Sequence, residues 1–277
     1  MRTIVSMKWL ASQLEQQDVT VIDCRFVLGS PEAGREAYRQ GHIPGAYYFH
    51  LEEDLSGPKE EHGGRHPLPD FEALAAKLAS TGIKPGGTIV AYDDQGGAMS
   101  SRLWWLLKYI GIEASIFVMD EGFTKWKEAG YPVTEEIPPS RPGEVTVNLQ
   151  PQLLASMEDV KQRIGREGVV LIDSREEPRF RGLAEHIDPV AGHIPSAINL
   201  FWKANLDAEG RWKPIKEQQA RFEKLQGAKE LIVYCGSGVT ACPNVLALEE
   251  AGFTNVKLYA GSWSDWITYP DNPVAKA

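Results

Sequence analysis

The chain contains the same series of short motifs twice, and this repetition restricts its possible folds more than any other sequence feature. Val-Ile-Asp-Cys-Arg at 21–25 returns 150 positions later as Leu-Ile-Asp-Ser-Arg at 171–175. Gly-His-Ile-Pro-Gly-Ala at 41–46 returns as Gly-His-Ile-Pro-Ser-Ala at 192–197. Solenoid repeats have periods of roughly 20 to 50 residues, so this much longer period predicts a duplicated domain.

A proline-rich stretch separates the two copies. Residues 137–143 read Ile-Pro-Pro-Ser-Arg-Pro-Gly, and prolines in such a run do not continue a helix. A length of 277 residues also suits two domains of common size. We therefore predict an N-terminal domain over residues 1–136, a linker over 137–149 and a C-terminal domain over 150–277.

Strand-like and helix-like segments alternate within each copy. This order predicts an α/β fold, in which each copy has a parallel sheet with helices on both faces. Ligands of such sheets bind at the carboxyl ends of the strands. The expected strands are 19–22, 88–92, 169–172 and 231–234, and the expected helices are 70–80, 101–110, 217–225 and 241–251.

Charge and composition exclude several classes of partner. The chain has 29 basic and 38 acidic residues, and the resulting charge of −9 repels nucleic acid and anionic lipid. The uncharged stretch 231–248 contains glycines and a proline, which argues against a membrane span. The first residues do not resemble a secretory signal, and three cysteines are too few for a disulfide scaffold. We predict a cytoplasmic monomer.

The loop after the strand 231–234 is the main candidate for a reactive site. Cys235 begins this loop, and Gly-Ser-Gly-Val-Thr follows it before the expected helix at 241–251. Glycines allow successive N–H groups to point inward, and a helix N-terminus adds positive potential, so a thiolate and a bound anion are both stabilised. We predict that Cys235 is reactive, whereas Cys24 is a core residue. The loop residues expected to bind substrate are Gly236, Gly238, Val239 and Thr240.

Three other chemistries of such a loop fit the sequence less well. A cysteine phosphatase requires an arginine six residues after its nucleophile, and Ala241 stands there. The glycine pattern at 236–241 lacks the acidic partner of a dinucleotide site about 20 residues further on. A dithiol site would read Cys-x-x-Cys, whereas Cys242 lies seven residues after Cys235 and retains at most a role in oxidative regulation.

The repeated Gly-His-Ile-Pro motifs, the repeated Asp-x-Arg strand ends and the cysteine loop together resemble the tandem-domain rhodanese-type sulfurtransferases. The resemblance covers nearly the whole chain. In this family only the C-terminal copy carries the nucleophile, and Asp93 stands at the corresponding place in the N-terminal copy. The loop is similar to that of the 3-mercaptopyruvate branch, because it lacks the basic residues typical of the thiosulfate branch.

The resemblance implies a ping-pong transfer of sulfur. Cys235 would take a sulfur atom from 3-mercaptopyruvate as a persulfide and pass it to a thiol, cyanide or a thioredoxin-like protein, with no metal or organic cofactor. Ser237 would supply a proton together with His66, which would reach across from the N-terminal domain. Arg179 would bind the carboxylate of the donor.

The sequence departs from the family pattern at two places. The aspartate expected to orient the histidine is replaced by His50, which leaves His50, Glu52 or Asp54 as its possible substitute. A second substrate arginine is missing, because residues 185–188 read Glu-His-Ile-Asp. A thiosulfate sulfurtransferase is therefore one alternative, and a non-catalytic module that senses sulfur or redox state is another.

Motifs shared by both copies are expected to be structural, since only one copy has the loop cysteine. His42 and His193 belong to this group. So do the pairs Asp23 with Arg25 and Asp173 with Arg175, which we interpret as strand-end ion pairs.

Overall fold

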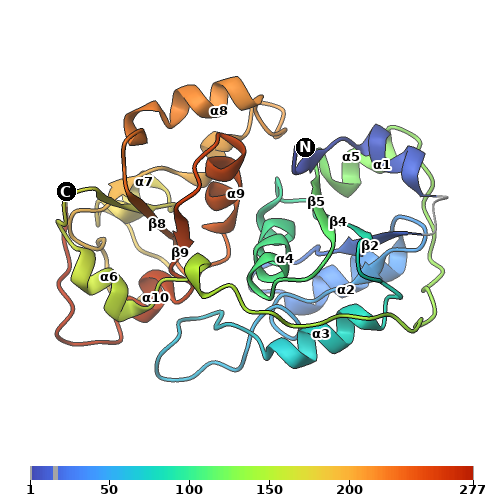
Figure 1. Ribbon diagram of the computed structural model, residues 1–277, viewed down its shortest axis with the longest axis horizontal. Helices are drawn as coiled ribbons and strands as arrows, with labels where there is room; N and C mark the ends of the chain where they lie inside the picture. Colours follow the sequence, from blue (N-terminus) through green and yellow to red (C-terminus); the bar gives the residue numbers. More distant parts are fainter. Residues whose placement is uncertain (1, 15–17, 277) are drawn as a thin grey trace. The chain divides into compact units, whose positions relative to one another are not determined.

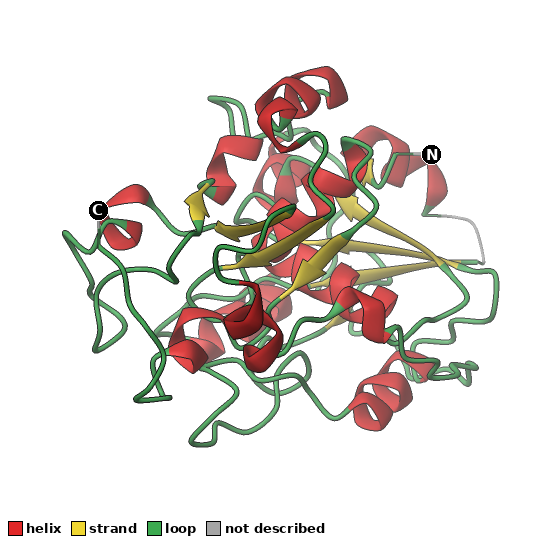
Figure 2. Ribbon diagram, turned by 60° about the vertical axis from the view of Figure 1, so that its left-hand side comes forward, coloured by secondary structure: helices red, strands yellow, loops and turns green. Residues whose placement is uncertain are grey.

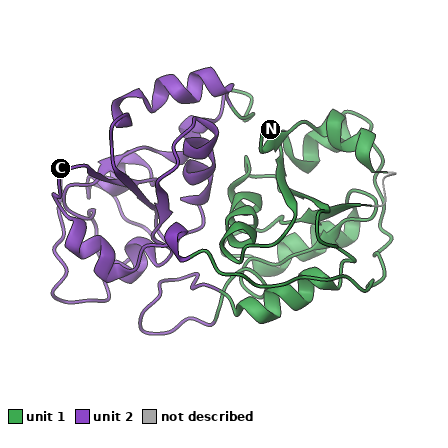
Figure 3. Cartoon of the chain, in the orientation of Figure 1, with its two compact units in different colours: residues 1–57, 69–150, 208–212 green, residues 58–68, 151–207, 213–277 purple. Residues whose placement is uncertain are grey.

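The computed structural model describes residues 2–14 and 18–276, which form two compact units (Figure 3). The first unit comprises Met1–Gly57, Pro69–Gln150 and Ala208–Trp212, and the second comprises Pro58–Leu68, Pro151–Asp207 and Lys213–Ala277. The predicted domain limits stay a prediction. Two segments differ in membership from that division. Pro58–Leu68 precedes the predicted linker and yet belongs to the second unit, and Ala208–Trp212 follows the linker and yet belongs to the first.

The first unit is built on a five-stranded sheet in which every described pairing is parallel, with the strand order β1-β5-β4-β2-β3. Helices flank the strands (Figure 2). The elements are β1 Ile4–Val5, α1 Met7–Gln13, β2 Val19–Asp23, α2 Pro31–Gln40, β3 Tyr47–Tyr48, α3 Phe71–Ala79, β4 Thr88–Tyr92, α4 Ala98–Tyr109, β5 Ser115–Met119 and α5 Gly122–Glu128.

The second unit has a four-stranded parallel sheet in the order β7-β6-β8-β9. Figure 1 labels its strands β8 and β9. The α/β architecture predicted from the alternating pattern is thus confirmed. The elements are η1 Pro151–Leu153, α6 Met157–Arg163, β6 Val169–Asp173, α7 Glu177–Phe180, β7 Ile198–Asn199, η2 Trp202–Asn205, α8 Ile215–Arg221, η3 Glu223–Leu225, β8 Glu230–Tyr234, α9 Cys242–Glu250, β9 Val256–Leu258 and α10 Ser262–Trp266.

The two sheets repeat the same register at their centres. Asp23 at the end of β2 pairs with Tyr92 of β4, and Asp173 at the end of β6 pairs with Tyr234 of β8. The next residue after each of these tyrosines is Asp93 in the first unit and Cys235 in the second. The duplicated sequence therefore places a carboxylate and a thiol at equivalent strand ends.

The Asp-x-Arg motifs form the expected strand-end ion pairs. Arg175 contacts Asp173 at 2.6 Å and donates to the carbonyl of Gly192 at 2.6 Å. Arg25 contacts Asp23 at the same distance. Both carboxylates are fully buried, and a buried charge requires such a partner, so each arginine compensates the charge of the aspartate two residues before it.

The repeated histidines have equivalent structural contacts. His42 Nδ1 lies 2.7 Å from the carbonyl of Tyr38, and its ring stacks on that tyrosine. His193 Nδ1 lies 2.7 Å from the carbonyl of Phe180, whose ring it also stacks on. Their predicted structural role is confirmed.

One predicted helix is shorter than expected. The stretch 217–225 was expected to be continuous, but α8 ends at Arg221 and the chain continues as the short helix η3. Phe222 separates the two with a ψ of 7°, and its side chain is fully buried. The helix therefore ends immediately before the residue whose ring enters the core. Among residues 2–14 and 18–276, no helix is long and apolar enough to cross a membrane.

Candidate active site

Strand β8 delivers Cys235 to the carboxyl edge of the second sheet, where its thiol is almost completely buried. The N–H of Gly238 points to Cys235 Sγ at 3.2 Å. An N–H donor stabilises a thiolate more than a thiol, because the interaction with the charged form is stronger. The loop between β8 and α9 thus turns a backbone donor toward the sulfur, as the glycine pattern predicts.

The loop requires glycine at position 238. Gly238 has a φ of +77°, and a Cβ at this residue would run into the carbonyl oxygen of Ala260. Both features exclude a larger residue without rearrangement of the loop. Val239 is buried and Thr240 is partly buried beside it. Helix α9 follows with Ala241 as its N-cap.

The start of α10 holds the cysteine loop in place. Trp263 donates its backbone N–H to the carbonyl of Cys235 at 3.0 Å, and Ser264 donates to the carbonyl of Gly236 at 2.9 Å. Ser262 Oγ accepts the N–H of Cys235 at 3.1 Å. The loop backbone is therefore fixed by three hydrogen bonds to one short element.

His66 and Ser237 meet within the second unit. His66 Nδ1 lies 2.8 Å from Ser237 Oγ, and both side chains are buried. Ser237 is two residues from Cys235 in the same loop. The two residues that the sequence singled out as proton donors are thus brought together at the loop that carries the thiol.

The segment Pro58–Leu68 carries His66 to this place by binding α10. Gly63 donates its N–H to Asp265 Oδ1 at 2.7 Å, and Arg65 donates its N–H to Ser264 Oγ at 3.0 Å. The sequence-based expectation assigned His66 to the N-terminal domain, and the contacts of its segment instead group it with the second unit. Hydrogen bonds between distant parts of the chain, which no local pattern encodes, account for the difference.

Arg179 lies beside the loop but is already bound to two carboxylates. Its Nη2 is 2.8 Å from Glu185 Oε1 and 3.0 Å from Asp188 Oδ2. Burial alone would raise the pKa of Glu185, but the hydrogen bonds from Arg179 and from the N–H groups of Asp188 and Ile187 outweigh it and lower that pKa. The stretch 185–188, which lacks the second arginine, thus supplies the acids that hold the first.

Sequence reasoning missed Arg65 and Asp188. The guanidinium of Arg65 forms an ion pair with Asp188, whose side chain is almost fully buried. The only available signal was the position of Arg65 next to His66, because nothing in the local sequence links residue 65 to residue 188.

The other cysteines have different surroundings. Cys242 Sγ lies 3.3 Å from the carbonyl of Gly238, within the site. Cys24 is buried in the first unit, where burial, followed by the nearby Asp23, raises the pKa of its thiol well above the ordinary value. This location fits its predicted role as a core residue.

The residues considered as substitutes for the orienting aspartate all belong to the first unit. Asp54 pairs with Lys77 and accepts the backbone N–H of His50 at 2.6 Å. His50 Nε2 lies 3.1 Å from the carbonyl of Pro31, and Glu52 is exposed. Their role toward His66 remains a prediction.

Asp93 occupies the equivalent loop of the first unit. Its carboxylate accepts the N–H groups of Gln95, Gly97, Met99 and Ser100 at 2.7 to 3.0 Å. An anion is thus held at the N-terminus of α4 by backbone donors. The same type of loop in the second unit has a thiol at its first residue.

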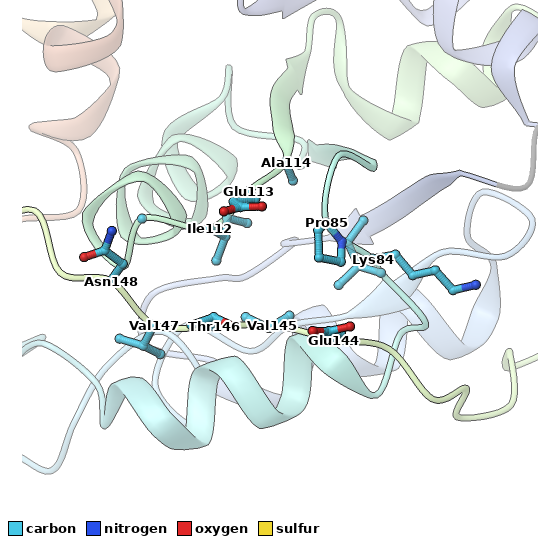
Figure 4. A pocket seen from close by; sticks show the side chains of 12 residues that line it. Lys84, Pro85, Ile112, Glu113, Ala114, Glu144, Val145, Thr146, Val147 and Asn148 are labelled. Carbon is cyan, nitrogen blue, oxygen red and sulfur yellow. The ribbon is translucent and has the colours of Figure 1, made fainter.

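A separate cavity of about 510 Å³ lies in the first unit (Figure 4). The segment 144–148 runs along one side of it, opposite Lys84, Pro85 and the residues around Glu113. Among the described residues that line it, none carries a thiol or an imidazole. The reactive groups named above therefore lie elsewhere.

Comparison with known proteins agrees with this geometry. The model of the family described as "Rhodanese-like domain" matches residues 6–129 and again residues 156–269. The chain belongs to the rhodanese family. Both halves of this rhodanese-family chain are thus covered, and the second match includes the cysteine loop.

Relatives of this rhodanese-family chain extend over its full length. A protein of Pseudomonas aeruginosa named "Probable 3-mercaptopyruvate sulfurtransferase" is 44% identical over 98% of this chain and 97% of its own length. The thiosulfate sulfurtransferase of Gallus gallus is 32% identical over 96% and 93%. The crystal structure of the Escherichia coli 3-mercaptopyruvate sulfotransferase SseA is 30% identical, with a TM-score of 0.81 over 95% of this chain and all of that one.

Proposed function

We propose that this chain is a sulfurtransferase that moves a sulfur atom from 3-mercaptopyruvate to a thiol or cyanide acceptor through a persulfide on Cys235. The observation that carries this proposal is the buried thiol at the end of β8, with the Gly238 N–H at 3.2 Å and the His66–Ser237 hydrogen bond beside it. Full-length relatives named for this activity support it.

In the first half-reaction the Cys235 thiolate attacks the sulfur of the donor. A sulfur–sulfur bond forms and the carbon–sulfur bond breaks, and its electron pair remains on the carbon as the enolate of pyruvate. The enolate takes a proton from the Ser237 hydroxyl, and His66 replaces that proton across their hydrogen bond. Pyruvate leaves, and Cys235 carries the outer sulfur.

In the second half-reaction an acceptor thiolate or cyanide attacks the outer sulfur, and Cys235 leaves as a thiolate. The Gly238 N–H stabilises this leaving group as it stabilises the nucleophile in the first step. No group other than the donor, the acceptor and these side chains is needed to balance either step. The acceptor is a small thiol, cyanide or a thioredoxin-like protein.

Thiosulfate is the second candidate donor, because full-length relatives at 32% identity are named thiosulfate sulfurtransferases. Comparing kcat/KM for the two donors decides between them. The alternative of a non-catalytic sensing module is disfavoured by the intact Cys235 loop and by the names of the relatives.

The test is a donor-dependent assay. Incubation with 3-mercaptopyruvate should release pyruvate and add one sulfur atom to the protein, which mass spectrometry detects. Cys235→Ser should abolish both. The matched control is Cys24→Ala, which removes another buried thiol and should leave both results unchanged. Full turnover by Cys235→Ser would falsify the proposal.

We also propose a cytoplasmic, monomeric protein that acts on small molecules and binds neither nucleic acid nor membranes. The three cysteines are buried and form no disulfide, as is usual in a reducing compartment. Gel filtration and cell fractionation test the two parts of this proposal.

A further inference from the structure

The arginine at position 65 is held in a fixed place by the backbone around it. Its N–H donates to Ser264 Oγ at 3.0 Å, and the preceding Gly64 has a φ of +81°. A Cβ on Gly64 would meet the carbonyl oxygen of Gly261, so the segment lies directly against the start of α10. The backbone position from which the Arg65 side chain extends is therefore well defined.

The guanidinium of Arg65 lies over the cysteine loop. Its Nη1 pairs with Asp188. Its Nη2 lies 2.9 Å from the position that a Cβ would take on Gly236, the residue next to Cys235. One terminal nitrogen is thus anchored by a buried acid, while the other lies beside Gly236, the residue that follows Cys235.

Arg179 approaches the same point from a different part of the unit. Its Nη1 and Nη2 both lie 3.7 Å from the same Cβ position on Gly236. Asp188 also binds this arginine, at 3.0 Å, and so holds both guanidinium groups together. Two planar cations therefore converge where Gly236 contributes no side chain.

The charges in this cluster favour a ligand with a single negative charge. Asp188 and Glu185 pair with Arg65, Arg179 and Arg175, and Asp173 pairs with Arg175. Three arginines and three acids balance, so the cluster offers directed N–H donors rather than excess positive charge. A thiolate on Cys235 would repel a dianion more strongly than a monoanion, and a single carboxylate can accept N–H donors from two guanidinium groups.

We propose that Arg65 and Arg179 together bind the carboxylate of the 2-oxo acid donor, with Arg65 in place of the second arginine that the stretch 185–188 lacks. This inference rests on the proposed function and names the specificity-determining residues of the same site. Arg65 is a substrate-binding residue, and Asp188 positions both arginines.

Alkylation of Cys235 tests the proposed carboxylate site of Arg65 and Arg179 without enzymatic turnover. Iodoacetate carries a carboxylate and iodoacetamide is its neutral analogue, so the ratio of their rates measures attraction of a carboxylate to the site. Arg65→Ala should lower the iodoacetate rate about tenfold and leave the iodoacetamide rate within about twofold, because a charge-assisted hydrogen bond is lost. The KM for 3-mercaptopyruvate should rise by a similar factor.

Two further variants make the result specific. Arg65→Lys keeps the charge but loses the planar donor pair, so an intermediate ratio is expected. Arg181→Ala removes a half-exposed arginine of the same unit and should change neither rate. Thermal melting establishes that each variant folds. If Arg65→Ala does not fold, the comparison of the two alkylation rates is made with Arg65→Lys instead.

The outcomes separate this inference from the proposed function. Equal slowing of both reagents in Arg65→Ala, or no change in their ratio, overturns the two-arginine site even if Cys235→Ser abolishes pyruvate release. Conversely, if the unmodified protein releases no pyruvate, the proposed function fails. The anion site would still stand in that case if the ratio of the iodoacetate rate to the iodoacetamide rate depended on Arg65.

Discussion

Ser237 combines two properties at the scale of single residues. It lies in the nucleophile loop, and its hydroxyl is 2.8 Å from an imidazole that comes from a distant segment of the chain. A hydroxyl alone is a weak acid near neutral pH, and the contact with His66 gives it an imidazole partner with which it can exchange a proton. The pair is therefore suited to protonate a leaving carbanion.

Removing this hydroxyl should affect the protonation step and spare the nucleophile. We expect Ser237→Ala to lower kcat with 3-mercaptopyruvate about a hundredfold, the lower end of the range for general acid–base groups. Alkylation of Cys235 by iodoacetamide should stay within about twofold, because the thiol keeps the Gly238 N–H. Ser237→Thr, which retains a hydroxyl, is the control, and equal loss in both variants would point to packing instead.

At the scale of elements, the segment Pro58–Leu68 and helix α10 act together. The segment brings Arg65 and His66 to the site, and α10 holds both this segment and the cysteine loop. One short helix thus aligns the nucleophile with the groups around it. The proposed roles of Arg65 and His66 therefore require correct docking of the segment.

Gly64 provides a test of this docking. Gly64→Ala places a Cβ against the carbonyl of Gly261 and should displace the segment, with a loss of kcat of about tenfold or more. Gly29 is the matched control: its φ is +83°, close to the +81° of Gly64, yet a Cβ there meets nothing within 4 Å. Gly29→Ala should cost about 1 kcal/mol of stability through backbone strain alone and retain full activity.

The loop of the first unit carries Asp93 at the position where the second unit carries Cys235. Asp93 accepts four backbone N–H groups at the start of α4, and a neutral amide in its place binds them less strongly. We expect Asp93→Asn to lower the free energy of unfolding by about 1 to 3 kcal/mol in urea titrations. Asp271→Asn, at an exposed position, should change it by less than about 0.5 kcal/mol. Equal changes in the free energy of unfolding in the two variants would contradict a stabilising role of the Asp93 carboxylate.

At the scale of the whole molecule, ion-paired carboxyls make stability depend on pH. Burial alone would raise the pKa of Glu230, but hydrogen bonds from Lys257 and Arg163 outweigh it and hold that pKa below its ordinary value of 4.5. The pKa of Glu185 is also lowered, because its hydrogen bonds outweigh its burial. The folded state therefore binds these protons less readily than the unfolded state does.

The expected pH dependence follows from that sign. The stabilisation from Glu230 is fully present above its ordinary pKa of 4.5 and is lost as the pH falls through its folded pKa. Urea unfolding between about pH 7 and pH 3 should therefore show decreasing stability below about pH 4.5. Glu230→Gln should be less stable at pH 7 and lose less stability on acidification. A curve for Glu230→Gln parallel to that of the original chain would contradict this.

The sequence by itself determined the duplication, the α/β class, the strand ends that carry Asp93 and Cys235, and the glycine loop. These features follow from local patterns, since strand periodicity, turn residues and positive φ are properties of adjacent positions. The tertiary structure alone placed Pro58–Leu68 in the second unit and brought Arg65 beside both Asp188 and Gly236. Those contacts join residues 123 or more positions apart, and side-chain packing selects them without leaving a local trace in the sequence.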